Sequence, residues 1–133
     1  MNNPGVFPLA ALQIGAAKSL SLLSPIVDLD GMSAVSLEAN FQYGSGGTNC
    51  SAIVATSFDL GTTWRHVARF DFLVATVVKT ANLSGLLSKA VAAYADLPSE
   101  GVNDGLLGSQ LAVYLVSTGA YVNTTLSVRA SVR

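Results

Sequence analysis

The sequence is poor in charge. Only 11% of its 133 residues are Asp, Glu, Lys or Arg, whereas a typical soluble domain has about 25%. With seven Lys and Arg and a formal net charge of −1, the chain offers no basic patch, so a nucleic-acid partner is not expected. It also lacks an uninterrupted apolar run of about 18 residues, so no membrane association is expected.

Reactive side chains are equally scarce. Cys50 is the only cysteine, which excludes an intrachain disulfide, and its place in an apolar strand pattern predicts a buried free thiol. His66 is the only histidine and has no Ser, Cys or second metal ligand at a recognisable spacing. No catalytic carboxylate pair stands out among the eight acidic residues. We therefore expect no catalytic residue, no metal site and no cofactor, and a protein that is not an enzyme.

What the sequence does have is apolar residues, which make up half of the chain and give a mean hydropathy of +0.50. A chain of this length forms one domain with a substantial core. Because so few residues are charged, much of the surface is expected to face other protein, as in a permanent subunit.

Alternation of apolar and polar residues predicts β-strands. The alternation is strict in Ser33–Tyr43 and again in Ala120–Val132, which indicates strands with one buried face. The strand candidates are Ser19–Val27, Ser33–Tyr43, Cys50–Phe58, Trp64–Leu73, Thr76–Leu83, Leu106–Ser117 and Ala120–Val132. Seven or eight strands with short turns predict an all-β fold, an antiparallel β-sandwich and possibly a jelly roll.

Three segments between the strands have competing interpretations. Asp28–Gly31 resembles part of a calcium loop, but the remaining ligands are missing, so a turn is expected. Gly44–Gly47 is glycine-rich, yet no Lys-Ser/Thr follows it, which favours a turn over a phosphate-binding loop. Ser84–Asp96 has apolar residues at helical spacing and is expected to be either a helix or an ordered connection across the end of the sandwich.

The first 17 residues differ from the rest of the chain. Pro4 and Pro8 interrupt them, and they lack the basic start of a secretory signal. We expect residues 1–17 to form an extended arm that docks on a neighbour and residues 18–133 to form the β-sandwich domain. The candidate arm contacts are Phe7, Leu9, Leu12 and Ile14.

The stretch Ser57-Phe58-Asp59-Leu60-Gly61-Thr62-Thr63-Trp64 reads S-x-D-x-G-x-T-W. It resembles the Asp-box, a β-hairpin motif of sialidases and of many unrelated β-proteins, and this resemblance implies a structural role. We expect the Asp59 carboxylate to accept hydrogen bonds from loop N–H groups, Gly61 to adopt a positive φ, and Trp64 to tie the turn to the core. No repeat of the motif is found, so a sialidase-type propeller is not expected.

A second resemblance concerns turn motifs. Phe41–Gly47, the hairpin through Trp64, and Asp104–Gly108 leading to Ser117–Tyr121 are similar to small structural proteins of tailed bacteriophages. The resemblance implies a virion component made in the host cytoplasm. The expected function is that of a capsid decoration or head-associated protein, or alternatively of a neck or tail subunit. The expected partners are further copies of the chain, for example in a trimer, and the major capsid protein.

A carbohydrate-binding module is the alternative from a different class, because β-sandwiches bind sugars through exposed aromatic side chains. The candidate platforms besides Phe are Trp64, Tyr43, Tyr94, Tyr114 and Tyr121.

Overall fold

The computed structural model describes residues 4–133, which form eleven β-strands and no helix. The strands are β1 (Gly5–Ile14), β2 (Lys18–Leu22), β3 (Ala34–Gln42), β4 (Ser45–Gly46), β5 (Asn49–Ser57), β6 (Arg65–Phe72), β7 (Val77–Ser84), β8 (Gly101–Val102), β9 (Gln110–Thr118), β10 (Tyr121–Val122) and β11 (Thr124–Val132). Because the described part of the chain has no helix, it has no helix that could cross a membrane.

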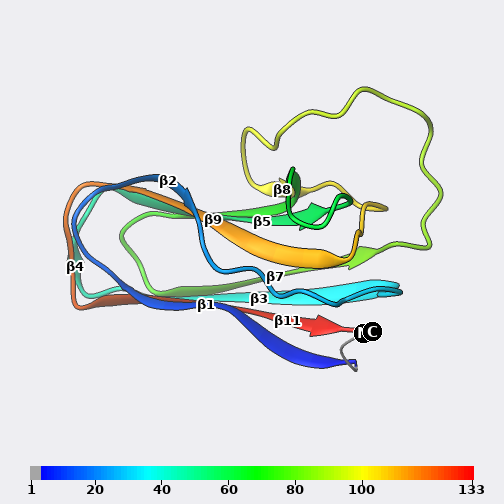
Figure 1. The fold of residues 1–133 in the computed structure, drawn as a ribbon. Coiled ribbons are helices and arrows are strands. Elements are labelled where there is room, and N and C mark those ends of the chain that lie inside the picture. Colours follow the sequence, from blue (N-terminus) through cyan, green and yellow to red (C-terminus); the bar gives the residue numbers. More distant parts are fainter. Residues whose placement is uncertain (1–3) are drawn as a thin grey trace.

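Two antiparallel sheets face each other, as Figure 1 shows. The first has the strand order β1-β11-β3-β7 and the second the order β2-β9-β5-β6-β8, while β4 and β10 form a small ladder at one end. The predicted antiparallel β-sandwich is confirmed.

The eight longer strands pair from the outside of the sequence inwards. The chain's first long strand pairs with its last, β1 with β11, and the following pairs are β2 with β9, β3 with β7, and β5 with β6. Such pairing describes one long hairpin that is rolled up into two sheets, which is the strand arrangement of a jelly roll.

The core lies between the sheets and follows from the alternation in the sequence. In β3, Val35, Leu37, Ala39 and Phe41 are buried, and the residues between them face solvent or are half-buried. The ring of Phe41 stacks on that of Phe72 in the opposite sheet at 4.8 Å between centroids. Aromatic stacking of this kind adds to the stabilisation from buried area and joins the two layers.

The expected N-terminal arm is wrong for the residues that the structure describes. Residues 5–14 are strand β1, which pairs with β11 along its length, so position 17 is not a domain boundary. Of the four expected arm contacts, Leu9 and Ile14 are buried in this chain's own core, and Phe7 and Leu12 pack against it. Their apolar side chains therefore contact this chain's own core. Residues 1–3 lie outside the described part.

The helix considered for Ser84–Asp96 does not form. Strand β7 ends at Ser84, and the chain then continues without regular structure until β8 begins at Gly101. We call residues 85–100 the long loop. A helix there would need an apolar stripe buried against the body, but Leu86, Leu87 and Val91 are all exposed.

Candidate functional site: the long loop and its attachment to β6

The Asp-box-like turn between β5 and β6 is held by side chains. The Asp59 carboxylate accepts hydrogen bonds from the Thr63 N–H (2.8 Å) and hydroxyl (2.6 Å), and the Ser57 hydroxyl accepts one from the Gly61 N–H (2.8 Å). The bonds from Thr63 lower the pKa of Asp59 to about 2. Gly61 has a φ of 93°, so the expected contacts of Asp59 and backbone shape at Gly61 are confirmed.

Trp64 does not tie this turn to the core as expected. It is half-buried, precedes the first residue of β6, and is not among the side chains that pack against the core. Its ring instead lies over Gly61, with ring carbon Cζ2 3.8 Å from the position that a Cβ would take there. The turn leaves Phe58 59% and Leu60 79% exposed.

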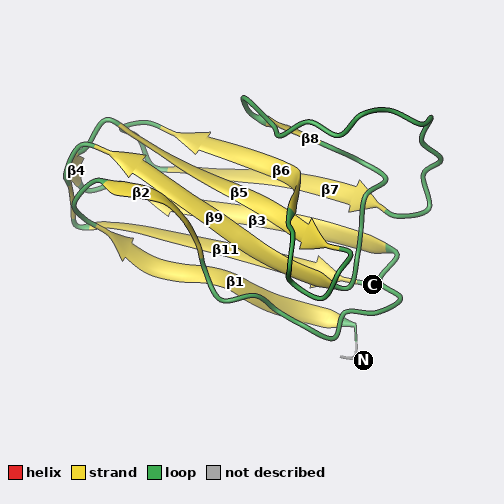
Figure 2. Cartoon of the chain, turned by 45° about the horizontal axis from the view of Figure 1, so that its top comes forward, coloured by secondary structure: helices red, strands yellow, loops and turns green. Residues whose placement is uncertain are grey.

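The long loop carries a second group of exposed apolar side chains. Leu86 is 82% exposed and Val91 fully exposed, and the segment between them includes Leu87 and Ala90. Figures 1 and 2 show that the loop extends beyond the sandwich and that the chain then comes back to the edge of β6 at β8. Loops of more than about 12–15 residues without secondary structure are uncommon in compact domains and often have a function.

A β-bulge directs His66 toward this loop. In the ladder of β5 and β6, Val54 pairs with Ala68 but Ala55 pairs with His66, so one extra residue, Val67, is inserted. Val67 joins the core cluster and His66 lies on the outer face of its sheet. Regular alternation would have placed His66 on the same face as Phe70 and Phe72, so the bulge is what makes it available to the loop.

The contacts of His66 attach the loop to the sheet. Its Nδ1 accepts a hydrogen bond from the Leu97 backbone N–H (3.2 Å), and the backbone N–H of His66 donates to the Tyr94 hydroxyl oxygen (2.6 Å). That hydroxyl donates to Asp96 (2.7 Å), and the Arg65 guanidinium lies over the Tyr94 ring at 4.9 Å. Burial and the hydrogen bond to Asp96 raise the pKa of Tyr94 to about 12, which keeps the hydroxyl protonated.

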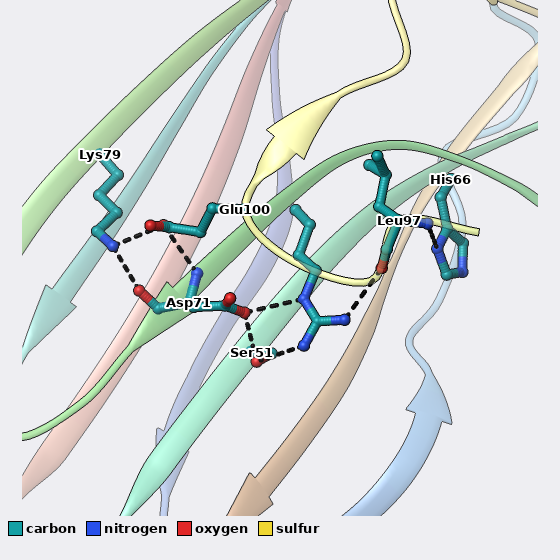
Figure 3. A network of polar contacts seen from close by, with 7 residues as sticks. Ser51, His66, Asp71, Lys79, Leu97 and Glu100 are labelled. Atoms are coloured by element: carbon teal, nitrogen blue, oxygen red, sulfur yellow. Dashed lines mark hydrogen bonds and ion pairs between the residues drawn. The ribbon is translucent and has the colours of Figure 1, made fainter. Parts of the chain in front are cut away.

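A second set of contacts, drawn in Figure 3, attaches the end of the loop. Arg69 donates to the Leu97 carbonyl (3.0 Å) and to Asp71 (2.9 Å). Glu100 accepts hydrogen bonds from the Asp71 N–H (3.0 Å) and from the Lys79 ammonium (2.6 Å). These bonds join the loop to both sheets, since Lys79 belongs to β7 and the others to β6 or to the loop.

The charge of Asp71 is stabilised by this network. Burial by itself would raise the pKa of Asp71, but the hydrogen bonds from Ser51 (2.7 Å) and Arg69, together with the nearby Lys79, outweigh it and hold that pKa below its ordinary value. The carboxylate therefore remains ionised and keeps Arg69 in place for its bond to the loop.

A pocket of about 430 Å³, partly open to solvent, lies between the loop and the body. Phe58 of the Asp-box-like turn, Leu87, Val91 and Tyr94 of the loop, and Leu106 line it, with Arg65 and Lys89 among its polar lining residues. The middle of the loop is thus a mainly apolar, exposed surface, and the part that follows it, from Tyr94 to Glu100, is fixed by hydrogen bonds and an ion pair. Such a surface is suited to contact with another macromolecule.

The polar groups here hold the loop and form no recognisable catalytic arrangement. Ser51 bonds to Asp71 and Arg69, whereas His66 bonds to the loop, so no contact joins the hydroxyl and the imidazole. Within residues 4–133, no group of three or more His, Cys, Asp or Glu side chains could hold a metal ion. Cys50 is buried between the sheets as predicted, and burial raises the pKa of its thiol to about 11.

Most of the tyrosines considered as sugar platforms are buried or make contacts within this chain. Tyr121 is buried in the core and its hydroxyl donates to the Leu73 carbonyl (2.8 Å). Tyr43 and Tyr114 are half-buried, and the hydroxyl of Tyr43 donates to the Gly46 carbonyl. Tyr94 is exposed, but both its ring and its hydroxyl belong to the loop attachment described above.

Sequence reasoning missed the loop attachment. The bulge leaves only one departure from the alternation, the apolar Val67 among the polar positions Arg65, Arg69 and Asp71, and this alone does not identify a bulge. Nothing in the spacing of Tyr94, Asp96 and Leu97 indicates that they contact β6. The available signal was the run of apolar residues between Leu86 and Tyr94, which matched a helix as well as a connection.

Comparison of the chain with protein-family models, with curated proteins and with solved structures gave no match.

Proposed function

We propose that this protein is a non-enzymatic structural subunit of a bacteriophage particle, a capsid decoration or head-associated protein that contacts neighbouring subunits through the long loop. The observation that carries the proposal is the exposed apolar middle of that loop, whose C-terminal part is attached to β6. An exposed loop usually consists of polar residues, and leaving this one apolar is favourable when a partner covers it.

Two further features support the proposal. The jelly-roll arrangement is common in viral capsid proteins, although lectins and cupins also use it. A chain with only 11% charged residues has a surface typical of a subunit in a large assembly. The turn motifs that resemble tailed-phage structural proteins point to the same class of protein.

The first experiment locates the protein. An antibody against the chain is applied to purified particles of the phage that encodes it, followed by gold labelling and electron microscopy. We expect label on the head surface. Label at the neck or tail would support the alternative virion position, and particles without the protein would overturn the proposal.

The second experiment tests the loop. Particles that lack the protein are mixed with purified wild-type chain or with the double variant Leu87→Ser, Val91→Ser, and bound protein is measured after sedimentation. The control is Leu73→Ser, Val74→Ser, which removes two comparably exposed apolar side chains from the turn between β6 and β7. We expect binding to fall at least tenfold in the loop variant only. Equal binding by all three proteins would contradict the role of the loop.

Carbohydrate binding is a second candidate function because of one groove. It has a volume of about 610 Å³ and lies on the outer face of the sheet that contains β1, β11, β3 and β7. Its polar lining residues are Ser36, Glu38, Thr80, Asn82, Arg129 and Ser131. Polar groups fixed on strands are suited to sugar hydroxyls, and a glycan array with the wild type and Glu38→Ala tests this candidate. Glycan binding that Glu38→Ala abolishes would support it.

A further inference from the structure

The edge of β7 differs from the other sheet edges. Backbone alternation shows where its N–H and C=O groups point. Ala34 exchanges hydrogen bonds with Arg133, so its backbone faces away from β7, and Ser84, which is opposite Ala34, likewise faces away from β3. In agreement with this, the Ser84 N–H donates to the Asp104 carboxylate (2.7 Å) rather than to β3.

The same alternation makes Val78, Thr80 and Asn82 present their backbone groups to the outside. They are opposite Asn40, Glu38 and Ser36 of β3, which lie six, four and two positions after Ala34. Within residues 4–133, no hydrogen bond to the outward backbone groups of these three residues is found. Their side chains are exposed on the outer face, Val78 by 52% of its area, so the edge is open to solvent.

The other edges are protected in the ways that natural sheets use. β1 contains Pro8, which has no N–H, and a register shift between Pro8 and Ala10. β2 has only five residues with a register shift of its own, and β8 has two residues. β7 is eight residues long and regular, contains no proline, and its only charged side chain, Lys79, is held by Glu100 and the Asp71 carbonyl.

We propose that the edge of β7 pairs with the β7 edge of a second copy of this chain, which joins two sheets into one continuous antiparallel sheet across a two-fold axis. The inference concerns a different surface from the long loop and does not depend on the proposed function. This pair has two-fold symmetry, whereas the example of an oligomer expected from the sequence is a trimer.

The pattern of β7 is self-complementary, which is why a second copy is the occupant. The three outward-facing residues are centred on Thr80, so a two-fold axis at this residue places Thr80 opposite Thr80 and Val78 opposite Asn82 of the second copy. Each opposed pair can exchange two backbone hydrogen bonds. Lys79 is then opposite Ala81, and no like charges meet.

The test uses Thr80→Lys, which sets two ammonium groups opposite each other on the axis. The matched control is Thr125→Lys, the same substitution at an exposed position of the central strand β11, on the same face of the same sheet. Light scattering should give twice the chain's mass for the wild type and Thr125→Lys, and the mass of one chain for Thr80→Lys. Because salt screens charges, high ionic strength should partly restore pairing of Thr80→Lys.

Amide hydrogen exchange supplies the second readout. The N–H groups of Val78, Thr80 and Asn82 should be protected in the wild type and exchange rapidly in Thr80→Lys. A wild type that stays monomeric with rapid exchange at these amides overturns the inference, as does an oligomer that Thr80→Lys leaves intact. Protected amides in a wild type that light scattering shows to be monomeric also overturn it, because no second copy then covers the edge. The gold-labelling experiment tests the proposed function separately, because its result does not depend on whether β7 pairs with a second copy.

Discussion

At the scale of single residues, His66 is the group through which pH can act on the long loop. Its Nδ1 must be unprotonated to accept the Leu97 N–H, so the neutral ring carries its hydrogen on Nε2. Burial lowers the pKa of His66 from its ordinary value of 6.5, Arg69 lowers it further, and Asp96, whose carboxylate is 3.8 Å from Nε2, opposes the shift. Tyr94 and Tyr114 are its other neighbours with titratable groups.

From this follows a prediction of how stability depends on pH. Since the folded-state pKa of His66 is lowered, the unfolded chain binds the proton more readily. The contribution to stability is therefore complete above about pH 6.5 and is lost as the pH falls through the folded-state pKa. After correction for the intrinsic exchange rate, the Leu97 amide should exchange faster as the pH is lowered below 6.5.

The comparison variant is His66→Asn, whose side-chain oxygen can accept the Leu97 N–H but does not titrate in this range. Its corrected Leu97 exchange should be nearly independent of pH between 5 and 8. If wild type and variant showed the same pH profile, His66 would not be the group that controls the attachment.

At the scale of elements, periodicity located the strands but not their irregularities. The strict alternation in Ser33–Tyr43 corresponds to β3, whose inner face is buried against the other sheet. The alternation in Ala120–Val132 corresponds to β10 and β11, which Asn123 separates, and only β11 follows it, since Val122 of β10 is exposed. The prediction of an arm is wrong because it takes two prolines to exclude a strand, whereas an edge strand tolerates Pro8. The sequence does not predict the bulge at Val67. It therefore does not predict the candidate site, because the bulge sets the face of the sheet on which His66 lies.

A turn at the other end of the sandwich gives a prediction at this scale. A Cβ at Gly44 would lie 2.2 Å from the Val122 carbonyl oxygen and 2.4 Å from that of Asn123. Gly44→Ala therefore forces the chain between β3 and β4 away from the chain between β10 and β11, and should destabilise the protein by about 1–3 kcal/mol. Gly15→Ala is the control, because nothing lies within 4 Å of its added Cβ.

Urea unfolding followed by far-UV circular dichroism measures both variants. Only Gly44→Ala should lower the midpoint, with no change in the slope of the transition. Equal midpoints for Gly44→Ala and the wild type would mean that this turn can move at no cost.

At the scale of the whole molecule, the rolled hairpin makes stability depend on contacts between the two ends of the chain. β1 pairs with β11, and most close contacts in the fold join residues far apart in sequence. The first described strand is thus part of the core, and the β-sandwich of residues 18–133 that the sequence predicted is incomplete without it. Folding must bring the two ends together before the β1 pairing forms, which is slow for such long-range topologies.

Deletion of residues 1–14 tests this dependence. The truncated chain loses the buried side chains of Leu9 and Ile14 and leaves an edge of β11 unpaired. Removal of one large buried aliphatic side chain costs about 2–5 kcal/mol, and a typical domain is stable by only about 5–15 kcal/mol, so the truncated chain should not unfold cooperatively. A synthetic peptide of residues 4–17 should restore a cooperative transition by re-forming the ladder with β11. Gln13→Ala, an exposed position of the same strand, should leave the thermal midpoint within a few degrees of the wild type. A truncated chain with the wild-type midpoint would show instead that these residues behave as an arm and that the core closes without them.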